Sequence, residues 1–492
     1  MRTLLFLLTA ILLSAAGVYA DLHDPANSAD YLIVTTDSLI ASTPWISDLA
    51  AWRQSHGRTA MVVATDDIWN EFGNGTPSDT VLKEFFHYAR EHWALPQLRD
   101  VFIIGFHDVV PSHIEVDSQY VSDQWIVYSY FSDVFYTWHP DSTALPPSLL
   151  LSIGRLPWSP TWETALPNYY QKCQQYETAP EGDWQRRIHL IADYDDTMFH
   201  FGNDFSEPLA ELVPSTYLIE RDYLGLPAEN PWHGDQDEIH ANYNSGSFIS
   251  VYSGHGGAGV WSGSSLADSG FFSDLTNNPR YTIQLHTCYD MASAPRLDMG
   301  GIALALLYNP NGGAIGYFAN TNISWAFTGI TFRRAMFSVA FADSTYTLGD
   351  LWLFGQREFI RTYPWGSDAF NPTRQTSLSC MLLGDPGLVL PARPSAIEEL
   401  HTAYPAELRL TGNYPNPFNA STQIRFELDR TMHVSLRVFD VTGREAAVLV
   451  DGVRPAGEFH VQWDAARFSS GMYFAVLQAG KVRQVQKMML LK

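Results

Sequence analysis

A histidine between glycines and a cysteine further along the chain are the residues whose types and positions suggest chemistry. His255 stands in Ser253-Gly-His-Gly-Gly257, directly after the apolar run 248–252, and Cys288 follows the end of the next expected strand, in His286-Thr-Cys-Tyr-Asp290. Glycines beside a histidine let the backbone approach a ligand and leave the imidazole exposed. In a parallel sheet, both side chains would follow the carboxyl ends of strands, at the edge where ligands of α/β proteins bind.

A thiol and an imidazole at one sheet edge can act as a nucleophile and its base. A neighbouring imidazolium lowers the pKa of a thiol from its ordinary value of about 8.5, so that thiolate becomes available. The thiolate of Cys288 would attack a carbonyl, and the imidazolium of His255 would protonate the leaving amine. The backbone amides of Gly256 and Cys288 could hold the resulting oxyanion.

Two other interpretations of these residues stay open. His255, His286, Cys288 and Asp290 are all metal-ligand types, so a zinc site is the second interpretation. The third is inert packing, in which the histidine caps a turn and the cysteine is a small buried hydrophobe.

Short apolar runs that alternate with amphipathic stretches are the elements that must position these residues. Continuous apolar strands between helices predict mostly parallel sheets covered on both faces, and hence an α/β fold. A break near 180–186 predicts two α/β subdomains, 24–182 and 183–391. The expected strands are 31–35, 61–64, 101–104, 149–153, 188–192, 216–220, 247–253, 281–286 and 314–318, and the expected helices are 44–56, 78–93, 162–177, 299–308, 327–341 and 348–360.

The last part of the chain has a different character. Residues 392–405 contain prolines and little apolar pattern, so they are expected to be a linker. Beyond them the charge balance changes from strongly acidic to slightly basic, and short runs alternate apolar with polar residues between Gly, Pro, Asn and Asp. This pattern predicts a separate small all-β sandwich over 406–492, with about seven short strands.

Composition limits the class of partner. The 492 residues include 30 basic and 53 acidic ones, for a formal net charge of −23 at pH 7. Such a surface repels phosphate backbones and anionic lipid headgroups, so no nucleic-acid partner is expected. Three cysteines cannot build a disulfide framework. Cys173 and Cys380 lie in apolar surroundings and are predicted to be core residues.

The N-terminus predicts export. Arg2 precedes the apolar run 4–13, and Val18-Tyr-Ala20 follows with small residues at its two ends. These are the parts of a secretory signal peptide over 1–20, cleaved near Ala20. A membrane-spanning helix would need about 20 apolar residues. No later segment supplies them, so no stable membrane span is expected.

Seven sequence pieces, taken in order, make residues 30–390 resemble the gingipain-type cysteine peptidases of family C25. The catalytic domain of that family is a caspase-like α/β fold, and the resemblance implies the same fold here. The pieces are Tyr31-Leu-Ile-Val-Thr35, Ser132-Asp133 with Tyr136, Ile153-Gly-Arg155, Tyr252-Ser-Gly-His-Gly256, Cys288, Ser324-Trp325 and Leu383-Gly-Asp-Pro-Gly387.

The resemblance also implies roles for individual residues. Cys288 is the expected nucleophile and His255 its partner, with the amides after His255 and at Cys288 as the oxyanion hole. The carboxylate that orients the histidine falls best on Asp195, although Asp193 and Asp196 stand beside it in the same acidic loop. Trp325 matches an aromatic wall of the substrate pocket, and Asp204 stands in the region that supplies an acidic residue to that pocket in arginine-specific members. The family's long propeptide is not expected, because only about ten residues separate the signal peptide from the first strand.

Residues 405–492 resemble the C-terminal sorting domain of the type IX secretion system. Asn413-Tyr-Pro-Asn-Pro-Phe-Asn419 opens the domain, and Lys487-Met-Met-Leu-Leu-Lys492 closes it. Between them lie Val438-Phe-Asp-Val-Thr-Gly443 and Ser470-Gly-Met-Tyr-Phe474. The resemblance implies the secretion machinery as a partner and the cell surface or medium of a Gram-negative bacterium as the destination.

These observations together predict an exported cysteine endopeptidase that acts on proteins or peptides through a Cys-His dyad and a thioester. A sortase-like processing peptidase of exported proteins and a non-catalytic surface adhesin with the same fold are the alternatives. No cofactor is required by this chemistry, and no catalytic metal is assigned. Calcium is a possible structural ion at Asp193/Asp195/Asp196 or at Asp235/Asp237/Glu238, while acidic loops also occur simply for solubility.

Overall fold

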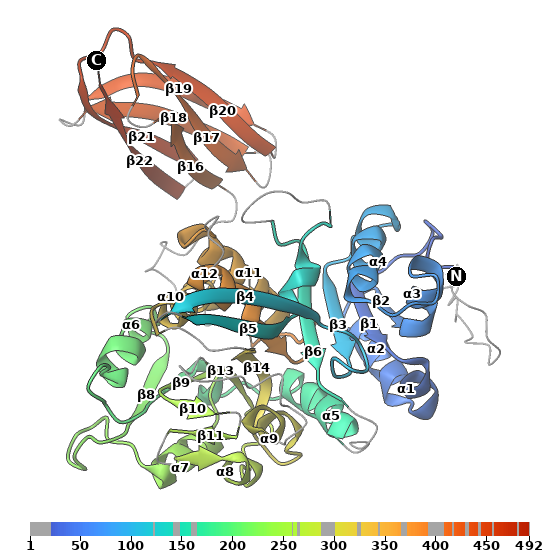
Figure 1. The fold of residues 1–492 in the computed structure, drawn as a ribbon. Helices are drawn as coiled ribbons and strands as arrows, with labels where there is room; N and C mark the ends of the chain where they lie inside the picture. Colours follow the sequence, from blue (N-terminus) through green and yellow to red (C-terminus); the bar gives the residue numbers. More distant parts are fainter. Residues whose placement is uncertain are drawn as a thin grey trace, which may run out of the picture. The chain divides into compact units, whose positions relative to one another are not determined.

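The computed structural model divides into two compact units, residues 1–400 and 401–492, which are described separately (Figure 1). The structure describes residues 21–121, 124–140, 148–158, 165–257, 259–262, 266–286, 301–321, 326–342, 345–365, 371–391, 408–415, 418–428, 432–440, 444–454, 457–479 and 482–491. The expected linker 392–405 lies outside these residues.

One ten-stranded sheet organises the first unit. Its order is β2 (Ala60–Ala64), β1 (Tyr31–Thr35), β3 (Asp100–Ile104), β6 (Ser152–Leu156), β15 (Cys380–Leu383), β14 (Ala314–Asn320), β13 (Thr282–His286), β9 (Ile249–Ser253), β7 (Arg187–Ala192) and β8 (Leu218–Tyr223). Neighbours are parallel throughout except for β14 and β15, which are antiparallel. The sheet therefore consists of two parallel blocks that run in opposite directions.

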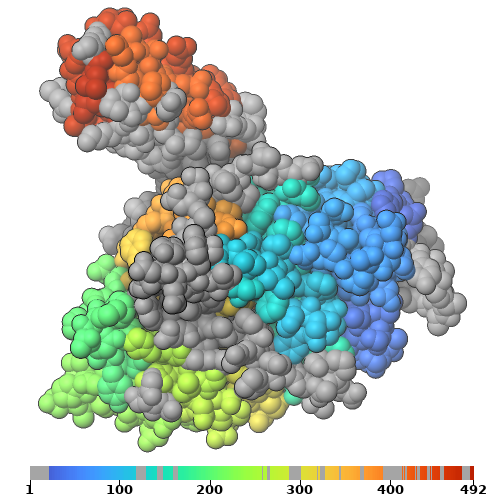
Figure 2. All heavy atoms as spheres, in the orientation of Figure 1, coloured from blue at the N-terminus to red at the C-terminus, as the bar shows by residue number. Residues whose placement is uncertain are grey.

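The two blocks correspond closely to the two halves of the sequence. Strands β1, β2, β3 and β6 lie in the first block, and strands β7, β8, β9, β13 and β14 lie in the second. Strand β15 is the exception, because it returns from the end of the unit to pair with β6. In the space-filling view, the blue first half and the green second half occupy opposite sides of this unit (Figure 2).

Helices cover both faces of the sheet, as the continuous apolar strands require. Tyr31 and Ile33 of β1 face one core, whereas Leu32 and Val34 face the other, because successive side chains of a strand point to opposite faces. The longer helices are α2 (Trp45–Ser55), α3 (Thr65–Phe72), α4 (Asp79–His92), α5 (Ala165–Glu177), α7 (Gln236–Ser245), α9 (Ile302–Tyr308), α10 (Ala326–Ala340), α11 (Leu348–Thr362) and α12 (Pro372–Ser379), with shorter ones at α1 (Asp37–Ser42), α6 (Glu207–Ala210) and α8 (Ser269–Ser273).

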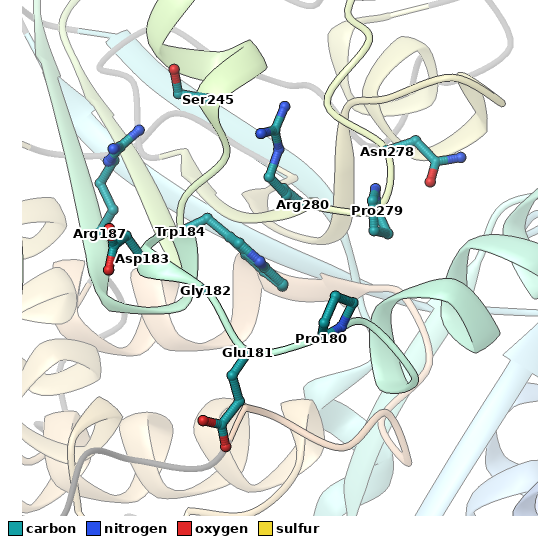
Figure 3. Close-up of a pocket in the computed structure, with 10 residues that line it drawn as sticks. All are labelled: Pro180, Glu181, Gly182, Asp183, Trp184, Arg187, Ser245, Asn278, Pro279 and Arg280. Atoms are coloured by element: carbon teal, nitrogen blue, oxygen red, sulfur yellow. The ribbon is translucent and has the colours of Figure 1, made fainter.

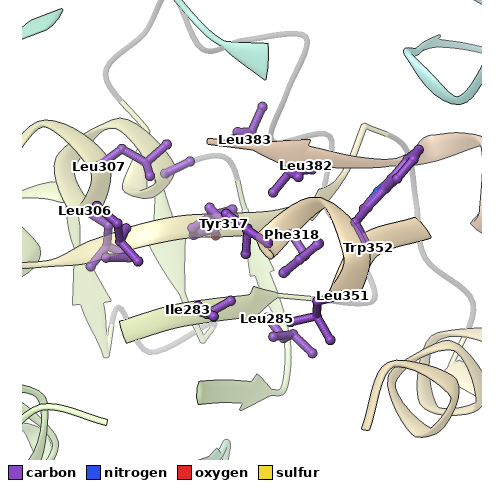
Figure 4. Close-up of a cluster of buried hydrophobic side chains, with 14 of the residues drawn as sticks. Ile283, Leu285, Leu306, Leu307, Tyr317, Phe318, Leu351, Trp352, Leu382 and Leu383 are labelled. Carbon is purple, nitrogen blue, oxygen red and sulfur yellow. The ribbon is translucent and has the colours of Figure 1, made fainter. Parts of the chain in front are cut away.

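The centre of the larger core lies where the two blocks meet. Leucines of α9, α11 and β15 pack there against β13 and β14, and Trp352 is fully buried among them (Figure 4). The mostly parallel α/β fold is therefore confirmed. Among the described residues, no helix combines the length and apolarity needed to cross a bilayer.

A hairpin of β4 (His113–Val121) and β5 (Gln124–Ser132) stands outside the large sheet. None of the strands expected from the sequence falls in this region. Glu115 and Asp117 on β4 are buried and pair with Arg374 of α12, at 2.9 and 2.8 Å. β4 therefore alternates in the reverse of the usual sense, with Glu115 and Asp117 facing inward and Ile114 and Val116 exposed.

The second unit consists of two antiparallel sheets. One holds β16 (Leu408–Tyr414), β17 (Ser421–Leu428) and β20 (Gly457–Asp464), and the other holds β19 (Glu445–Arg454), β18 (Met432–Asp440), β21 (Gly471–Ala479) and β22 (Val482–Leu490). Inward residues such as Ile424, Leu436 and Leu477 are fully buried in one core. This agrees with the predicted β-sandwich.

Candidate active site

His255 lies two residues beyond the end of β9, and Gly254 makes that position possible. A Cβ atom at residue 254 would stand 2.4 Å from Cβ of Asp193 and 2.5 Å from the hydroxyl oxygen of Tyr252. Both distances are far inside van der Waals contact. Glycine is therefore required here so that the end of β9 can lie against the residue that follows β7.

The backbone of His255 is held on both sides. Its N–H donates to Oδ2 of Asp193 at 3.1 Å. Its carbonyl oxygen accepts from the hydroxyl of Tyr252 at 2.7 Å and from the N–H of Ser262 at 2.8 Å. Because Asp193 is itself buried and Tyr252 is fully buried, the histidine is fixed by the interior of the protein.

The imidazole of His255 has a carboxylate partner. Its Nε2 lies 2.7 Å from Oδ2 of Asp196, and the edge of Phe201 packs against the ring at 5.1 Å between centroids. Oδ1 of Asp196 accepts from the N–H groups of Met198 and Phe199, which orients the carboxylate. The hydrogen bond from His255, followed by these two backbone bonds, lowers the pKa of Asp196. Each side chain of the pair remains 34% exposed, so a substrate can reach the ring.

Asp195 occupies a different position from the one the sequence suggested. Its Oδ2 pairs with Nδ1 of His200 at 2.9 Å, and this hydrogen bond raises the pKa of His200. The chain turns sharply after Asp195, with the N–H of Asp196 donating to the carbonyl of Phe199. That turn brings Asp196 rather than Asp195 back to the end of β9. From the sequence alone, Asp196 is only a further member of the acidic loop.

Asp204, the expected pocket residue, is exposed at the surface in the same region. It lies in the π-helical turn η4 (Phe201–Ser206), and its Oδ2 accepts from the N–H of His200 at 3.0 Å. Trp325, the other expected pocket residue, lies outside the described residues. The structure therefore gives no contact between these two.

Cys288 also lies outside the described residues, but the strand that leads to it is well defined. β13 is the parallel neighbour of β9, and its last residue, His286, pairs with Tyr252. The chain therefore leaves two adjacent strands at one edge of the sheet, two residues before His255 and two residues before Cys288. Gly256, the expected oxyanion residue, begins the short strand β10 (Gly256–Gly257), which pairs with β11 (Val260–Trp261).

His286 is a core residue. It is 3% exposed, its Nδ1 is hydrogen-bonded to the hydroxyl of Tyr317, and it packs against Tyr252 and Trp261. Burial, with a smaller contribution from Arg333, lowers its pKa to about 3, so the ring is neutral. Within the described residues, the carboxylate and histidine groups close enough to share a metal are Asp21/His23/Glu71 and His233/Asp235/Glu238, and neither contains His255 or His286.

The two acidic clusters considered for calcium form hydrogen bonds within the chain. Asp193, Asp195 and Asp196 contact His255, His200 and backbone amides, as described above. Asp235 and Glu238 form a reciprocal capping box at the start of α7, at 2.9 and 3.1 Å. A capping box alone explains acidic residues at these two positions.

A cavity of about 640 Å³ lies at the other edge of the sheet (Figure 3). Its walls come from residues 180–184, Arg187, Ser245 and residues 278–280. Arg187 is the first residue of β7, which is parallel to β9 and so has its N-terminal end opposite His255. This cavity is therefore separate from the site around His255.

Four of the sequence pieces quoted for the family resemblance contact one another in pairs. Arg155 on β6 is buried and forms a bidentate pair with Asp133, at 2.6 and 2.8 Å. The hydroxyl of Tyr31 donates to Oδ1 of Asp385 at 2.7 Å, and Asp385 also pairs with the buried Arg53. These contacts stabilise the fold, so these four sequence pieces have a structural role. They lie apart from His255.

The carboxyl edge of this α/β sheet carries a histidine–carboxylate pair. Beside that pair lies a strand that leads to a cysteine. The same fold is found in proteins of known structure. Solved structures with the same fold include the arginine-specific cysteine proteinase gingipain R (RgpB), with a TM-score of 0.56 and 16% sequence identity over 94% of this chain and 98% of that chain. The complex of the pro- and mature domains of RgpB from Porphyromonas gingivalis matches equally, with 16% identity and a TM-score of 0.56 over 94% of this chain and 100% of that chain. No curated protein matches the sequence.

Residues 24–391 match the family described as "Peptidase family C25", so this chain belongs to that family. Residues 413–491 match the "Secretion system C-terminal sorting domain". Both expected resemblances are confirmed. The members of the family are cysteine endopeptidases, and a sorting domain of this kind implies the type IX secretion machinery and export to the cell surface or medium.

Proposed function

We propose that this chain is an exported cysteine endopeptidase in which Cys288 is the nucleophile and His255 its base. The observation that carries the proposal is the position of His255, which is pinned through its backbone and paired with Asp196 at the end of β9. β13, the adjacent strand, ends two residues before Cys288. A histidine held in this way beside the approach to a cysteine suits a nucleophile–base pair.

The geometry suggests a division of labour between the two ring nitrogens. Because Nε2 of His255 faces the carboxylate of Asp196, its proton is directed there and Nδ1 is the nitrogen that acts as base. In this proposal Nδ1 takes the proton of the Cys288 thiol, and the thiolate attacks the peptide carbonyl. The amides of Gly256 and Cys288 receive the negative oxygen. Nδ1 then gives the proton to the leaving amine, and water hydrolyses the thioester.

Asp196 replaces Asp195 as the proposed orienting carboxylate, while Asp204 and Trp325 remain the proposed pocket residues. Asp204 stands in η4, the same turn that supplies Phe201 to the His255 ring. An acidic group there would favour a basic side chain next to the cut bond. No cofactor takes part in this chemistry, and a calcium ion would have a structural role.

Labelling of the purified mature protein with acyloxymethyl ketone probes tests the proposal. The probes carry Arg, Lys, Asp or Leu beside the reactive group. We expect one of them to label the protein, Cys288→Ala to abolish labelling, and Cys173→Ala to leave it intact, because Cys173 is fully buried in the core. Failure of all probes, with and without calcium and reductant, would favour the adhesin alternative.

The sortase-like alternative shares the thioester and differs in the acceptor. Adding a primary amine while the protein cleaves a peptide substrate distinguishes the two activities. Hydrolysis products alone support the endopeptidase, whereas a new amide with the added amine supports the sortase-like peptidase.

A further inference from the structure

The first residues after the expected signal-peptide cleavage site form an ordered, packed segment. Leu22 is fully buried, and the ring of His23 stacks on Phe72 at 4.4 Å between centroids, with an interplanar angle of 13°. The carboxylate of Glu71 approaches the same segment, and the carboxylate oxygens of Asp21 and Glu71 and a ring nitrogen of His23 lie within 4.8 Å of one another. The start of the mature chain is therefore held against the protein.

Cleavage after Ala20 would place histidine at the third position of a new N-terminus, Asp21-Leu22-His23. Such a terminus offers four nitrogens in sequence: the α-amine, the backbone nitrogens of residues 22 and 23, and the ring nitrogen Nδ1 of His23. Joined by short chelate rings, these four nitrogens can surround one ion in a plane. A square-planar nitrogen set is the geometry that Cu²⁺ and Ni²⁺ prefer.

Two of the four nitrogens already point at one place. The N–H of Leu22 lies 2.8 Å from Oε2 of Glu71, and Nδ1 of His23 lies 3.1 Å from the same oxygen. In a square-planar complex of this type, these two nitrogens stand opposite each other across the ion. The N–H of His23 donates to Oδ1 of Asp21 at 3.0 Å, and Asp21 is exposed, so this side chain can turn away.

The surrounding contacts also favour loss of the two amide protons, which such a complex requires. The carbonyl of the Asp21–Leu22 amide accepts from Nδ2 of Asn27 at 2.9 Å, and the carbonyl of the Leu22–His23 amide accepts from Nε1 of Trp93 at 2.9 Å. A hydrogen bond to the carbonyl oxygen stabilises the negative charge of a deprotonated amide, because that charge is shared between nitrogen and oxygen. Both donors come from outside the three-residue segment.

We propose that the mature N-terminus, Asp21-Leu22-His23, binds one Cu²⁺ ion through its α-amine, two backbone nitrogens and Nδ1 of His23, with Glu71 beside the ion as an axial oxygen ligand. The ion displaces one proton from the α-ammonium and one from each amide, and these protons go to solvent. This site rests on cleavage after Ala20 and is independent of the chemistry at His255.

Titration of the untagged mature protein with copper(II) chloride tests the site. We expect a visible absorption band of a square-planar Cu²⁺–peptide complex that saturates at one equivalent, and its loss in His23→Ala. His233→Ala changes the other histidine–carboxylate group and should leave the band unchanged.

A chain that retains Ala20 is the sharper comparison. It keeps every side chain of the site and moves only the α-amine, so that histidine stands fourth from the terminus. We expect this chain to lose the band. Persistence of the band would show that side chains alone bind the ion and would overturn the proposal. Absence of a one-equivalent band in the chain that begins at Asp21, or a mass-determined N-terminus of the exported protein other than Asp21, would also overturn it.

Discussion

Replacing Asp385 by asparagine tests whether buried charge stabilises the first unit. Asp385 is fully buried just after β15. Its Oδ2 accepts from Nε and Nη2 of Arg53, at 3.0 and 2.6 Å, and its Oδ1 accepts from the hydroxyl of Tyr31 and the N–H of Gly387, both at 2.7 Å. The carboxylate thus joins β1, α2 and the end of β15, which are far apart in the sequence.

The expected loss of stability follows from the charge of Arg53, which remains buried after Asp385 is replaced. Burial acts to lower the pKa of Arg53, but the carboxylates of Asp385 and Glu177 outweigh it and raise the pKa well above its usual value. Breaking a buried ion pair on one side costs about 3–5 kcal/mol. Because Glu177 still pairs with Arg53 at 2.6 Å, we expect Asp385→Asn at the lower end, about 3 kcal/mol, and Asp385→Ala at about 5 kcal/mol.

Urea unfolding followed by tryptophan fluorescence measures this effect. With a denaturant slope of about 3 kcal/mol per M, a loss of 3 kcal/mol lowers the midpoint by about 1 M. Asp183→Asn is the control, since its pair with Arg186 is largely exposed and should matter by less than about 1 kcal/mol. A midpoint for Asp385→Asn equal to that of the control would refute the reasoning.

Three further predictions concern the site. Asp196→Asn should slow probe labelling by about 10- to 100-fold, because the partner of His255 loses its charge. Asp195→Asn should have little effect on the labelling rate. A larger effect of Asp195→Asn than of Asp196→Asn would return the orienting role to Asp195. Because the pKa of Asp196 is lowered, its pairing with His255 stabilises the folded protein above the ordinary aspartate pKa of about 3.9, and this stabilisation is lost as the pH falls through the lower pKa of the folded state. Carboxyl-carbon NMR titration should show a resonance with a midpoint below the ordinary aspartate pKa, and this resonance should be absent in Asp196→Asn. Gly254→Ala should slow labelling by about tenfold or more without unfolding the chain. Gly259→Ala should leave the labelling rate unchanged, because a Cβ at residue 259 meets nothing within 4 Å. Equal labelling rates for the two variants would show that the close approach at residue 254 is unimportant.

The central strands could be predicted because a strand buried on both faces is apolar throughout. The strand expected at 149–153 shows the limit of this rule. It is found as β6 at Ser152–Leu156, because Arg155 continues the strand although it is charged. Its charge is neutralised by Asp133, a partner that local sequence cannot reveal.

The candidate site, too, could be predicted only in part from local sequence. The glycines around His255 and the order of apolar runs were sufficient to place the histidine at a sheet edge. The choice among Asp193, Asp195 and Asp196 was beyond the sequence, because it depends on a turn closed by Phe199. Asp193 serves the histidine backbone, Asp196 serves the ring and Asp195 serves His200, although the three residues lie within four positions.

The position of β15 has a consequence for how the protein is made. Leu383 pairs with Tyr317 on one side and with Arg155 on the other, so this short strand closes the gap between the two blocks. Until residues 380–383 have been synthesised, β6 and β14 each present an unpaired edge, and such edges invite pairing with other chains. A chain that stops before β15 should therefore aggregate. The ten-stranded sheet that positions His255 is therefore completed by one of the last segments of the α/β unit to be synthesised.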